Sequence, residues 1–180
     1  MKHIACGRAG RLFLALLVWL TAPARADMAP EAAVPAALAA PAGQVRLLVV
    51  AATGVQVYRC QPGKDDPAHL QWTLVAPEAD LFDESGHKVG RHYAGPTWEL
   101  DDGSKIVGEV LARDKGPDAE AIPWLLLRVK ESAAGGRLAK AASIQRIQTQ
   151  GGKAPAGQCE RTREPAELRV PYKAVYRFFG

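Results

Sequence analysis

One short stretch of this chain holds most of the side chains that could do chemistry. His92, Glu99 and Asp101 lie close together in the sequence, interleaved with Tyr93 and Trp98. A histidine beside a carboxylate can act as a general acid or base. Two carboxylates beside an aromatic ring can bind or cleave a sugar. These residue types therefore indicate either a ligand-binding site or a hydrolase-type active site on this stretch.

The acidic residues also have a simpler interpretation as turn formers. Asp101 and Asp102 precede Gly103, and aspartate is common in turns because its carboxylate accepts hydrogen bonds from nearby backbone amides. His87 and His92 are five residues apart and would point to opposite faces of a regular strand, and His69 is distant in the sequence. Without a third ligand at a recognisable spacing we expect no bound metal, and we expect no other cofactor.

A strand over 97–100 would divide its side chains between two faces. Trp98 and Leu100 would share one face, and Thr97 and Glu99 the other, because successive side chains alternate. A face with Trp98 and Leu100 belongs in the core, so Trp98 and Glu99 should not line one pocket unless a bulge intervenes. An aromatic pocket, if present, should include Trp98 and Trp124. The candidate ligand-binding residues are His92, Tyr93, Trp98, Glu99, Asp101 and Trp124, and the catalytic alternative uses His92 with Glu99 or Asp101.

The elements that must position these residues are short strands. Apolar and polar residues alternate at 70–76 and 170–178, which is the pattern of half-buried strands. Thr53-Gly54, Glu84-Ser85-Gly86 and Asp101-Asp102-Gly103 are turn signals, and the last two predict hairpins. Segment 139–149 is ambiguous between helix and strand. The other strand candidates are 44–51, 55–60, 70–76, 80–83, 87–93, 97–100, 104–113, 122–130 and 170–178. Roughly nine or ten short strands predict an all-β fold, an antiparallel sandwich or barrel.

The first 26 residues have the organisation of a secretory signal peptide. Lys2, Arg8 and Arg11 precede an unbroken apolar run at 12–20, and Ala24 and Ala26 supply the small residues of a cleavage site. The apolar run is too short for a stable membrane anchor. We therefore expect a secreted or periplasmic protein with no membrane span after signal removal, an Ala/Pro-rich segment at 27–43, and one β-rich domain at 44–180.

Export changes how the charges and cysteines are interpreted. The chain has 23 basic and 19 acidic residues, and four basic but no acidic residues lie before Asp27. The mature chain is therefore balanced, at 19 of each, which gives no reason to expect nucleic acid as a partner. Cys60 and Cys159 remain after cleavage, and an oxidising compartment predicts a disulfide between them. That bond would close a loop of about 100 residues and stabilise the fold by roughly 4–5 kcal/mol.

Several motifs in order resemble a known family. They are Gly95-Pro-Thr-Trp-Glu99, Asp102-Gly-Ser104, Ala121-Ile-Pro-Trp-Leu-Leu-Leu127, and Gly151-Gly-Lys-Ala-Pro155 before Cys159. The chain is similar, from about Val34 onward, to secreted bacterial and fungal proteins catalogued only as a domain of unknown function. The resemblance implies export and one compact domain, and it supplies no catalytic residues. Some fungal relatives carry a dehydrogenase label, but this chain lacks the Gly-x-Gly-x-x-Gly motif and βαβ pattern of a dinucleotide-binding fold.

Together these features favour an exported, non-enzymatic β domain that binds a small molecule, a glycan or an envelope component. The alternative is the hydrolase-type enzyme that uses His92. The two hypotheses differ in one spatial expectation, namely whether these side chains meet in one concavity. Neither the ligand nor the oligomeric state follows from the sequence.

Overall fold

The computed structural model describes residues 33–64, 66–133, 135–157, 159–160 and 166–180. Its regular elements are one short 3-10 helix and eight strands. They are η1 (Ala36–Leu38), β1 (Arg46–Pro62), β2 (Leu70–Phe82), β3 (Lys88–Tyr93), β4 (Thr97–Leu100), β5 (Lys105–Asp114), β6 (Trp124–Ser132), β7 (Ser143–Gly151) and β8 (Glu167–Phe179). The predicted signal peptide and the start of the Ala/Pro-rich segment lie outside the described residues.

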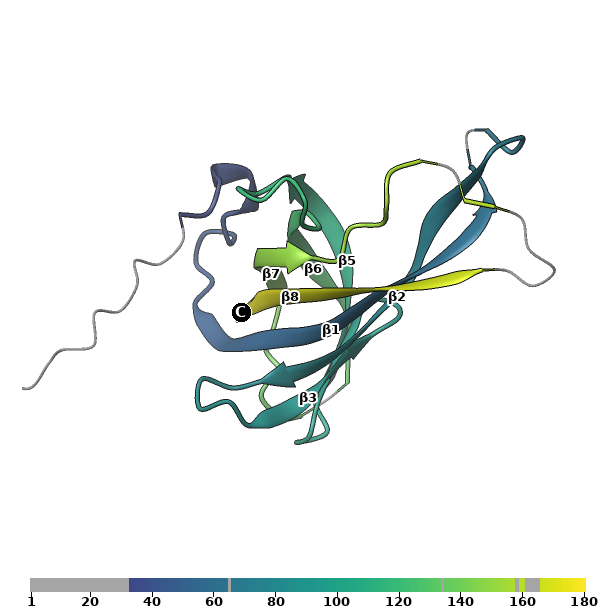
Figure 1. The fold of residues 1–180 in the computed structure, drawn as a ribbon. Coiled ribbons are helices and arrows are strands. Elements are labelled where there is room, and N and C mark those ends of the chain that lie inside the picture. Colours follow the sequence, from purple (N-terminus) through teal and green to yellow (C-terminus); the bar gives the residue numbers. More distant parts are fainter. Residues whose placement is uncertain (1–32, 65, 134, 158, 161–165) are drawn as a thin grey trace, which may run out of the picture. The chain divides into compact units, whose positions relative to one another are not determined.

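The eight strands form one closed antiparallel barrel, which confirms the predicted all-β fold (Figure 1). Each strand pairs with the next along the chain, and β8 closes the ring by pairing with β1. Within the ring, closure gives every described strand a partner on both sides. An eight-stranded barrel has an interior just wide enough to be filled by side chains or to hold one small ligand.

The strand number is eight, below the expected nine or ten, because two pairs of predicted strands are each continuous. Segments 44–51 and 55–60 both fall within β1, and 70–76 and 80–83 within β2. The predicted turn at Thr53-Gly54 is therefore wrong. Gly54 is instead a point of close approach, since a Cβ there would lie 2.1 Å from the carbonyl oxygen of Glu78 on β2. Glycine permits this contact without ending the strand. The ambiguous segment 139–149 becomes β7 from Ser143 onward.

The barrel interior is the main hydrophobic core, built from alternate residues of every strand. Its fully buried side chains include Leu81, Ile106, Leu127, Ile144 and Phe178. Trp98 and Leu100 both point inward from β4, as the alternation of that strand predicts. The core therefore fixes which residues of the Thr97–Leu100 strand can reach the interior.

A smaller cluster lies on the outer face of the barrel. There Leu38 of η1 packs with Trp124, Leu126 and Ile147, all of them buried. The Gln145 amide donates a hydrogen bond to the Leu38 carbonyl oxygen at 2.7 Å. The part of the Ala/Pro-rich segment that the structure describes thus covers one side of the barrel.

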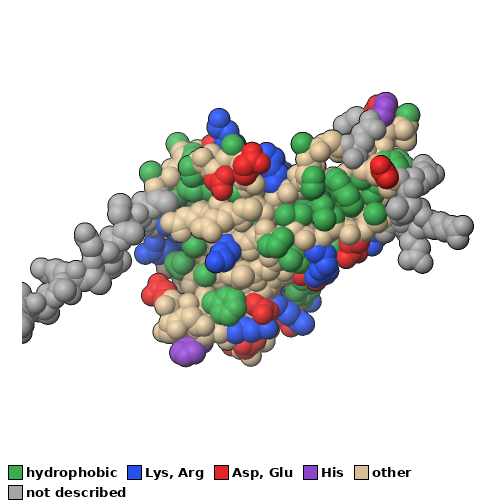
Figure 2. Space-filling view, viewed as in Figure 1, with side chains coloured by type: hydrophobic (Ala, Val, Ile, Leu, Met, Phe, Trp, Pro, Cys, Tyr) green, Lys and Arg blue, Asp and Glu red, His purple; other side chains and the backbone are tan. Residues whose placement is uncertain are grey.

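The ends of β1, β2 and β8 extend beyond the shorter strands (Figure 1). The predicted disulfide is present on this extension, where Cys60 of β1 is bonded to Cys159. Leu74 and Val75 of β2 are exposed nearby. Figure 2 shows hydrophobic side chains gathered on the side of the barrel from which β1 and β2 extend, while acidic and basic side chains are interspersed elsewhere on this face.

Candidate functional site

The barrel interior changes from apolar to polar along its axis. On β7 the inward residue after Ile144 is Arg146, and on β8 the inward residue before Phe178 is Tyr176. The same change occurs on β4, where Leu100 lies beside the apolar end and Trp98 nearer the polar end. Polar side chains are costly to bury unless they find partners. The concentration of polar side chains at one end of the interior therefore indicates a candidate binding site there.

A half-enclosed cavity of about 240 Å³ opens at this polar end. We call it the barrel-mouth cavity. It is lined by Gln56, Leu74, Val75, Pro77, His92, Gly95, Pro96, Trp98, Val110, Arg113, Leu125, Leu127, Arg146 and Tyr176. These residues come from all eight strands and from the turn between β3 and β4. The closure of the barrel brings them together from distant parts of the sequence.

His92 is a fully buried member of this lining. Its Nδ1 donates a hydrogen bond to the Thr97 carbonyl oxygen at 2.8 Å, so the neutral ring carries its proton there and keeps an acceptor lone pair on Nε2. The imidazole is stacked on the Trp98 indole, with ring centroids 4.4 Å apart. Burial lowers the pKa of His92 to about 3, against a smaller opposite effect of the Thr97 hydrogen bond. The ring is therefore neutral at physiological pH.

Three residues of the lining have a buried polar atom without a hydrogen-bond partner. They are Gln56 (Nε2), Trp98 (Nε1) and Tyr176 (Oη). Each of these atoms can donate a hydrogen bond, and the indole nitrogen can only donate. An unsatisfied buried polar group costs about 1–3 kcal/mol. Three such atoms belong to residues that line one cavity, which makes this cavity a candidate binding site.

Tyr176 has polar neighbours but no well-formed hydrogen bond. Its hydroxyl lies near Tyr172 and Arg146, and both lower its pKa, although neither contact has normal hydrogen-bond geometry. Burial is the larger influence and raises the pKa of Tyr176. The phenol therefore keeps its proton and remains able to donate.

Arg146 is held in place at the edge of this group. Its Nε and Nη2 both donate to the Pro123 carbonyl oxygen, at 3.1 and 2.8 Å. Within the described part of the chain, neither Arg146 nor Arg113 forms an ion pair with a carboxylate. Arg146 is half-buried and Arg113 is exposed. The cavity thus has a fixed cation inside and a second cation at its rim.

Two of the candidate residues, Tyr93 and Glu99, lie on the outer face of the barrel. The Tyr93 hydroxyl donates to Glu99 at 2.6 Å, and Arg91 donates to both oxygens of the same carboxylate at 3.1 Å. The Tyr93 hydrogen bond, followed by that from Arg91, lowers the pKa of Glu99. His92 and Glu99 therefore lie on opposite faces of the sheet, and the structure does not bring them together as an acid–base pair.

Asp101 and Asp102 lie in the turn between β4 and β5, and that hairpin is present as expected. Asp101 is exposed. Asp102 accepts hydrogen bonds from the Ser104 hydroxyl, the Ser104 amide and the Arg137 amide, which together lower the pKa of Asp102. This pattern is that of an aspartate that holds a turn in place. Neither carboxylate lines the barrel-mouth cavity.

Trp124 is also separate from the cavity. It is buried in the outer cluster beneath Leu38, whereas Trp98 lies inside the barrel. The two tryptophans therefore do not form a shared aromatic pocket. Of the six candidate residues, the structure brings His92 and Trp98 together in the cavity and places Tyr93, Glu99, Asp101 and Trp124 elsewhere.

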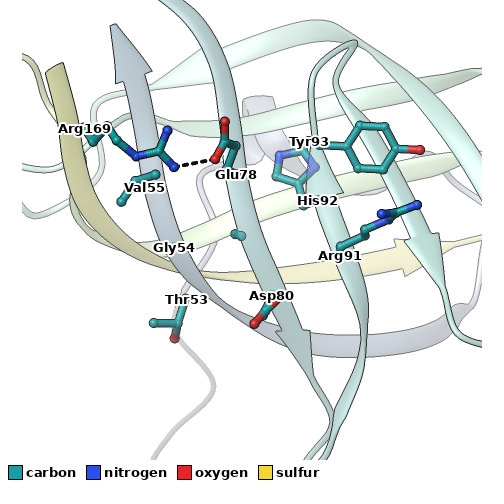
Figure 3. Close-up of a pocket in the computed structure, with 10 residues that line it drawn as sticks. Thr53, Gly54, Val55, Glu78, Asp80, Arg91, His92, Tyr93 and Arg169 are labelled. Carbon is teal, nitrogen blue, oxygen red and sulfur yellow. Dashed lines mark hydrogen bonds and ion pairs between the residues drawn. The ribbon is translucent and has the colours of Figure 1, made fainter. Parts of the chain in front are cut away.

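A second hollow is an open groove on the outer face, across β1, β2 and β3 (Figure 3). Each of its charged side chains has an ion-pair partner. Glu78 pairs with Arg169 of β8, and that contact is drawn in Figure 3. Asp80 pairs with Lys88, and Arg91 with Glu99. Because these charges already have partners, a charged ligand would gain little in the groove, in contrast to the barrel-mouth cavity.

Four lining residues with polar or charged side chains were not among the candidates, namely Gln56, Arg113, Arg146 and Tyr176. Tyr176 stood in the alternating pattern of the last strand, so its inward direction could have been found. Gln56 and Arg146 are polar residues at inward positions of apolar strands, and no local signal distinguishes them from outward ones. Among the described residues no group of histidine, cysteine, aspartate and glutamate side chains is suited to hold a metal, and no helix is long and apolar enough to cross a membrane.

The fold and cavity define a class, the closed eight-stranded antiparallel barrels with an interior hollow at one end. Within that class, residues 41–180 match the model of a family described as a protein of unknown function, DUF3455. The chain belongs to this family, as the linked motifs predicted. None of the curated proteins matches it.

Proposed function

We propose that this protein is a non-enzymatic binding protein that holds a small molecule in the barrel-mouth cavity. The observation that carries the proposal is the group of unpartnered donors on Gln56, Trp98 and Tyr176 around one half-enclosed cavity. A ligand with acceptor atoms would satisfy these donors and remove the cost of their burial. The acceptor on His92 Nε2 adds one place for a ligand hydroxyl.

The size of the cavity favours a small molecule over a glycan chain or a protein partner. At about 240 Å³ it is smaller than the ~300–1,000 Å³ of sites for drug-sized ligands. A cavity of ~150 Å³ already accommodates benzene. The ligand therefore has the size of one ring or a short chain, and its apolar part would contact Val110, Leu125 and Leu127.

We also propose that binding takes place outside the cytosol. The disulfide between Cys60 and Cys159 supports this, because such bonds persist in oxidising compartments. The signal-like organisation of the first 26 residues supports it independently. Cell fractionation of the producing organism, with sequencing of the mature N-terminus, tests this part. Intact precursor in the cytosolic fraction would contradict it.

The binding proposal is tested by the indole N–H resonances in nitrogen-15 NMR spectra. Phenol, benzyl alcohol, benzamide and benzoate are titrated in turn into the exported protein. We expect at least one probe to shift the Trp98 indole resonance, because Trp98 is part of the cavity lining, and to leave Trp124, which lies outside it, unchanged as an internal reference. No Trp98 shift with any probe at millimolar concentration would contradict the proposal.

A matched pair of variants on β5 localises the effect. Val110 lines the cavity, whereas the neighbouring Leu111 is exposed and outside it. Val110→Phe should fill the cavity and abolish the Trp98 shift, while Leu111→Phe should preserve it. Thermal melts establish that both variants fold. Equal binding by the two folded variants would place the ligand elsewhere.

A further inference from the structure

The charged side chains described around the barrel-mouth cavity are all positive. Two arginines line it, Arg113 and Arg146, and no aspartate or glutamate is among the described residues of the lining. The unpartnered atoms of Gln56, Trp98 and Tyr176 are all potential donors. The cavity therefore offers positive charge and several hydrogen-bond donors, while the side-chain acceptors of its described lining, such as His92 Nε2, are uncharged.

We propose that the ligand of this cavity is a small monocarboxylate with an apolar body. This inference rests on the proposed binding function and specifies its ligand class. The carboxylate would lie toward Arg146, Trp98 Nε1 and Tyr176 Oη. The apolar body would lie against Val110, Leu125 and Leu127.

Arg146 is suited to this role because it is already positioned. Its two bonds to the Pro123 carbonyl oxygen fix the guanidinium and leave Nη1 free of that contact. A planar guanidinium held in this way loses little side-chain entropy when it binds a carboxylate. A half-buried cation without a carboxylate partner is also costly, and an anionic ligand offsets that cost.

The remaining lining argues against a larger or more highly charged anion. Leu125, Leu127, Val110 and Pro77 occupy much of the wall and offer nothing to a second charge. Arg113 is exposed at the rim, where solvent weakens its effect and where it can attract an anion before entry. One charged group and one apolar body therefore fit this arrangement better than a phosphate ester does.

The outer groove differs from the cavity in that its positive charges are matched by negative ones. The charged residues of the groove are Glu78, Asp80, Arg91 and Arg169; Glu78 pairs with Arg169, Asp80 with Lys88, and Arg91 with Glu99. The charges of the groove thus have partners, whereas Arg146 forms no ion pair with a carboxylate among the described residues. An anionic ligand would therefore supply a missing partner in the barrel-mouth cavity but not in the outer groove.

Calorimetric titration with matched probes tests the ligand class. Benzoate, benzamide and benzylammonium have similar bodies and differ in charge, while acetate has the carboxylate and almost no body. We expect benzoate to bind at least about tenfold more tightly than benzamide, since hydrogen bonds to a charged group are the stronger kind. Benzylammonium should not bind, and acetate should bind more weakly than benzoate.

Charge-removing variants identify the arginines responsible. Arg146→Gln should abolish the preference for benzoate over benzamide, and Arg146→Lys should retain part of that preference. Arg113→Gln should lower the affinity for benzoate and make that affinity less dependent on salt concentration. Arg128→Gln is the matched control, because Arg128 pairs with Glu109 on the outer face. If Arg146→Gln does not fold, Arg146→Lys and Arg113→Gln still decide the question.

The outcomes separate this inference from the function on which it rests. Equal affinity for benzoate and benzamide, with the Trp98 resonance shifted by both, would overturn the carboxylate class and leave small-molecule binding intact. Acetate binding as tightly as benzoate would overturn the inference that the ligand has an apolar body. Absence of binding by every probe would overturn the proposed function itself.

Discussion

The indole ring of Trp98 lies stacked on the imidazole of His92, with the ring planes 18° apart. The two residues are directly opposite each other on β4 and β3. Tyr176 of β8 completes the cluster, since its ring centroid is 5.0 Å from His92 and 5.3 Å from Trp98. This aromatic group packs in the barrel interior and also lines the barrel-mouth cavity.

Replacement of Trp98 should mainly destabilise the fold. Trp98 is 1% exposed and contacts His92, Tyr176 and Phe178. Trp98→Ala removes these contacts and leaves a cavity, so we expect a loss of about 3–5 kcal/mol in the free energy of unfolding. Urea denaturation followed by circular dichroism measures it. An unchanged midpoint would show that Trp98 does not support the core.

Glu99→Gln provides the matched comparison from the same strand. Glu99 is on the outer face and its ion pair with Arg91 is open to solvent. Exposed ion pairs contribute little to stability, so the midpoint should move much less than for Trp98→Ala. Equal losses from the two variants would contradict the division of β4 into an inner and an outer face.

Stability should fall as the pH is lowered from 7 to 5, in part because of His92. The pKa of native His92 is about 3, whereas an unfolded histidine has the ordinary pKa of about 6.5. Between these values the unfolded chain binds a proton that the native protein does not, so protons favour unfolding. The contribution amounts to about 2 kcal/mol between pH 7 and pH 5.

The measurement compares urea unfolding at the two pH values for the native sequence and for His92→Asn. The asparagine amide can keep the hydrogen bond to the Thr97 carbonyl oxygen. The variant should show a smaller dependence on pH, and the difference isolates His92 from the other histidines. The same dependence in both proteins would mean that His92 takes up its proton as readily in the native state as in the unfolded chain.

Alternation along the strands made much of the fold predictable. It correctly assigned Trp98 and Leu100 to the interior and Glu99 to the other face. It failed at Gly54, because the turn signal of a glycine is the same whether the chain reverses or merely approaches a neighbouring strand. The close approach of β2 at Gly54 depends on pairing between distant segments, which no local pattern contains.

The candidate site was less predictable than the fold for a related reason. His92 and Trp98 were found because they are chemically distinctive and close in sequence. Arg146 and Gln56 reach the same cavity only because β7 and β1 join the closed ring. Their inward direction follows from pairing register, and a shift of one residue would reverse it.

Removal of the disulfide should lower stability by roughly 4–5 kcal/mol in the chain-entropy model, because the bond joins residues 99 apart. The double variant Cys60→Ser, Cys159→Ser tests this in urea denaturation, with the reduced native protein as its comparison. Peptide mapping of the exported protein without reductant should recover the Cys60–Cys159 pair. Two free thiols in correctly exported protein would contradict the bond.

Gly108→Ala should destabilise the barrel through the Trp98 ring. A Cβ at this position of β5 would lie 2.9 Å from Cζ3 of Trp98 and 3.3 Å from Cδ2 of Leu127. Neither neighbour can move far in a packed core, so we expect a loss of about 1–3 kcal/mol. The physical cause can be isolated with Trp98→Phe, whose smaller ring leaves room for the added methyl group. In a double-mutant cycle, Gly108→Ala should cost clearly less in the Trp98→Phe background than in the native one. Equal costs in both backgrounds would show that the glycine is required by the strand itself and that Trp98 does not set the close packing at this position.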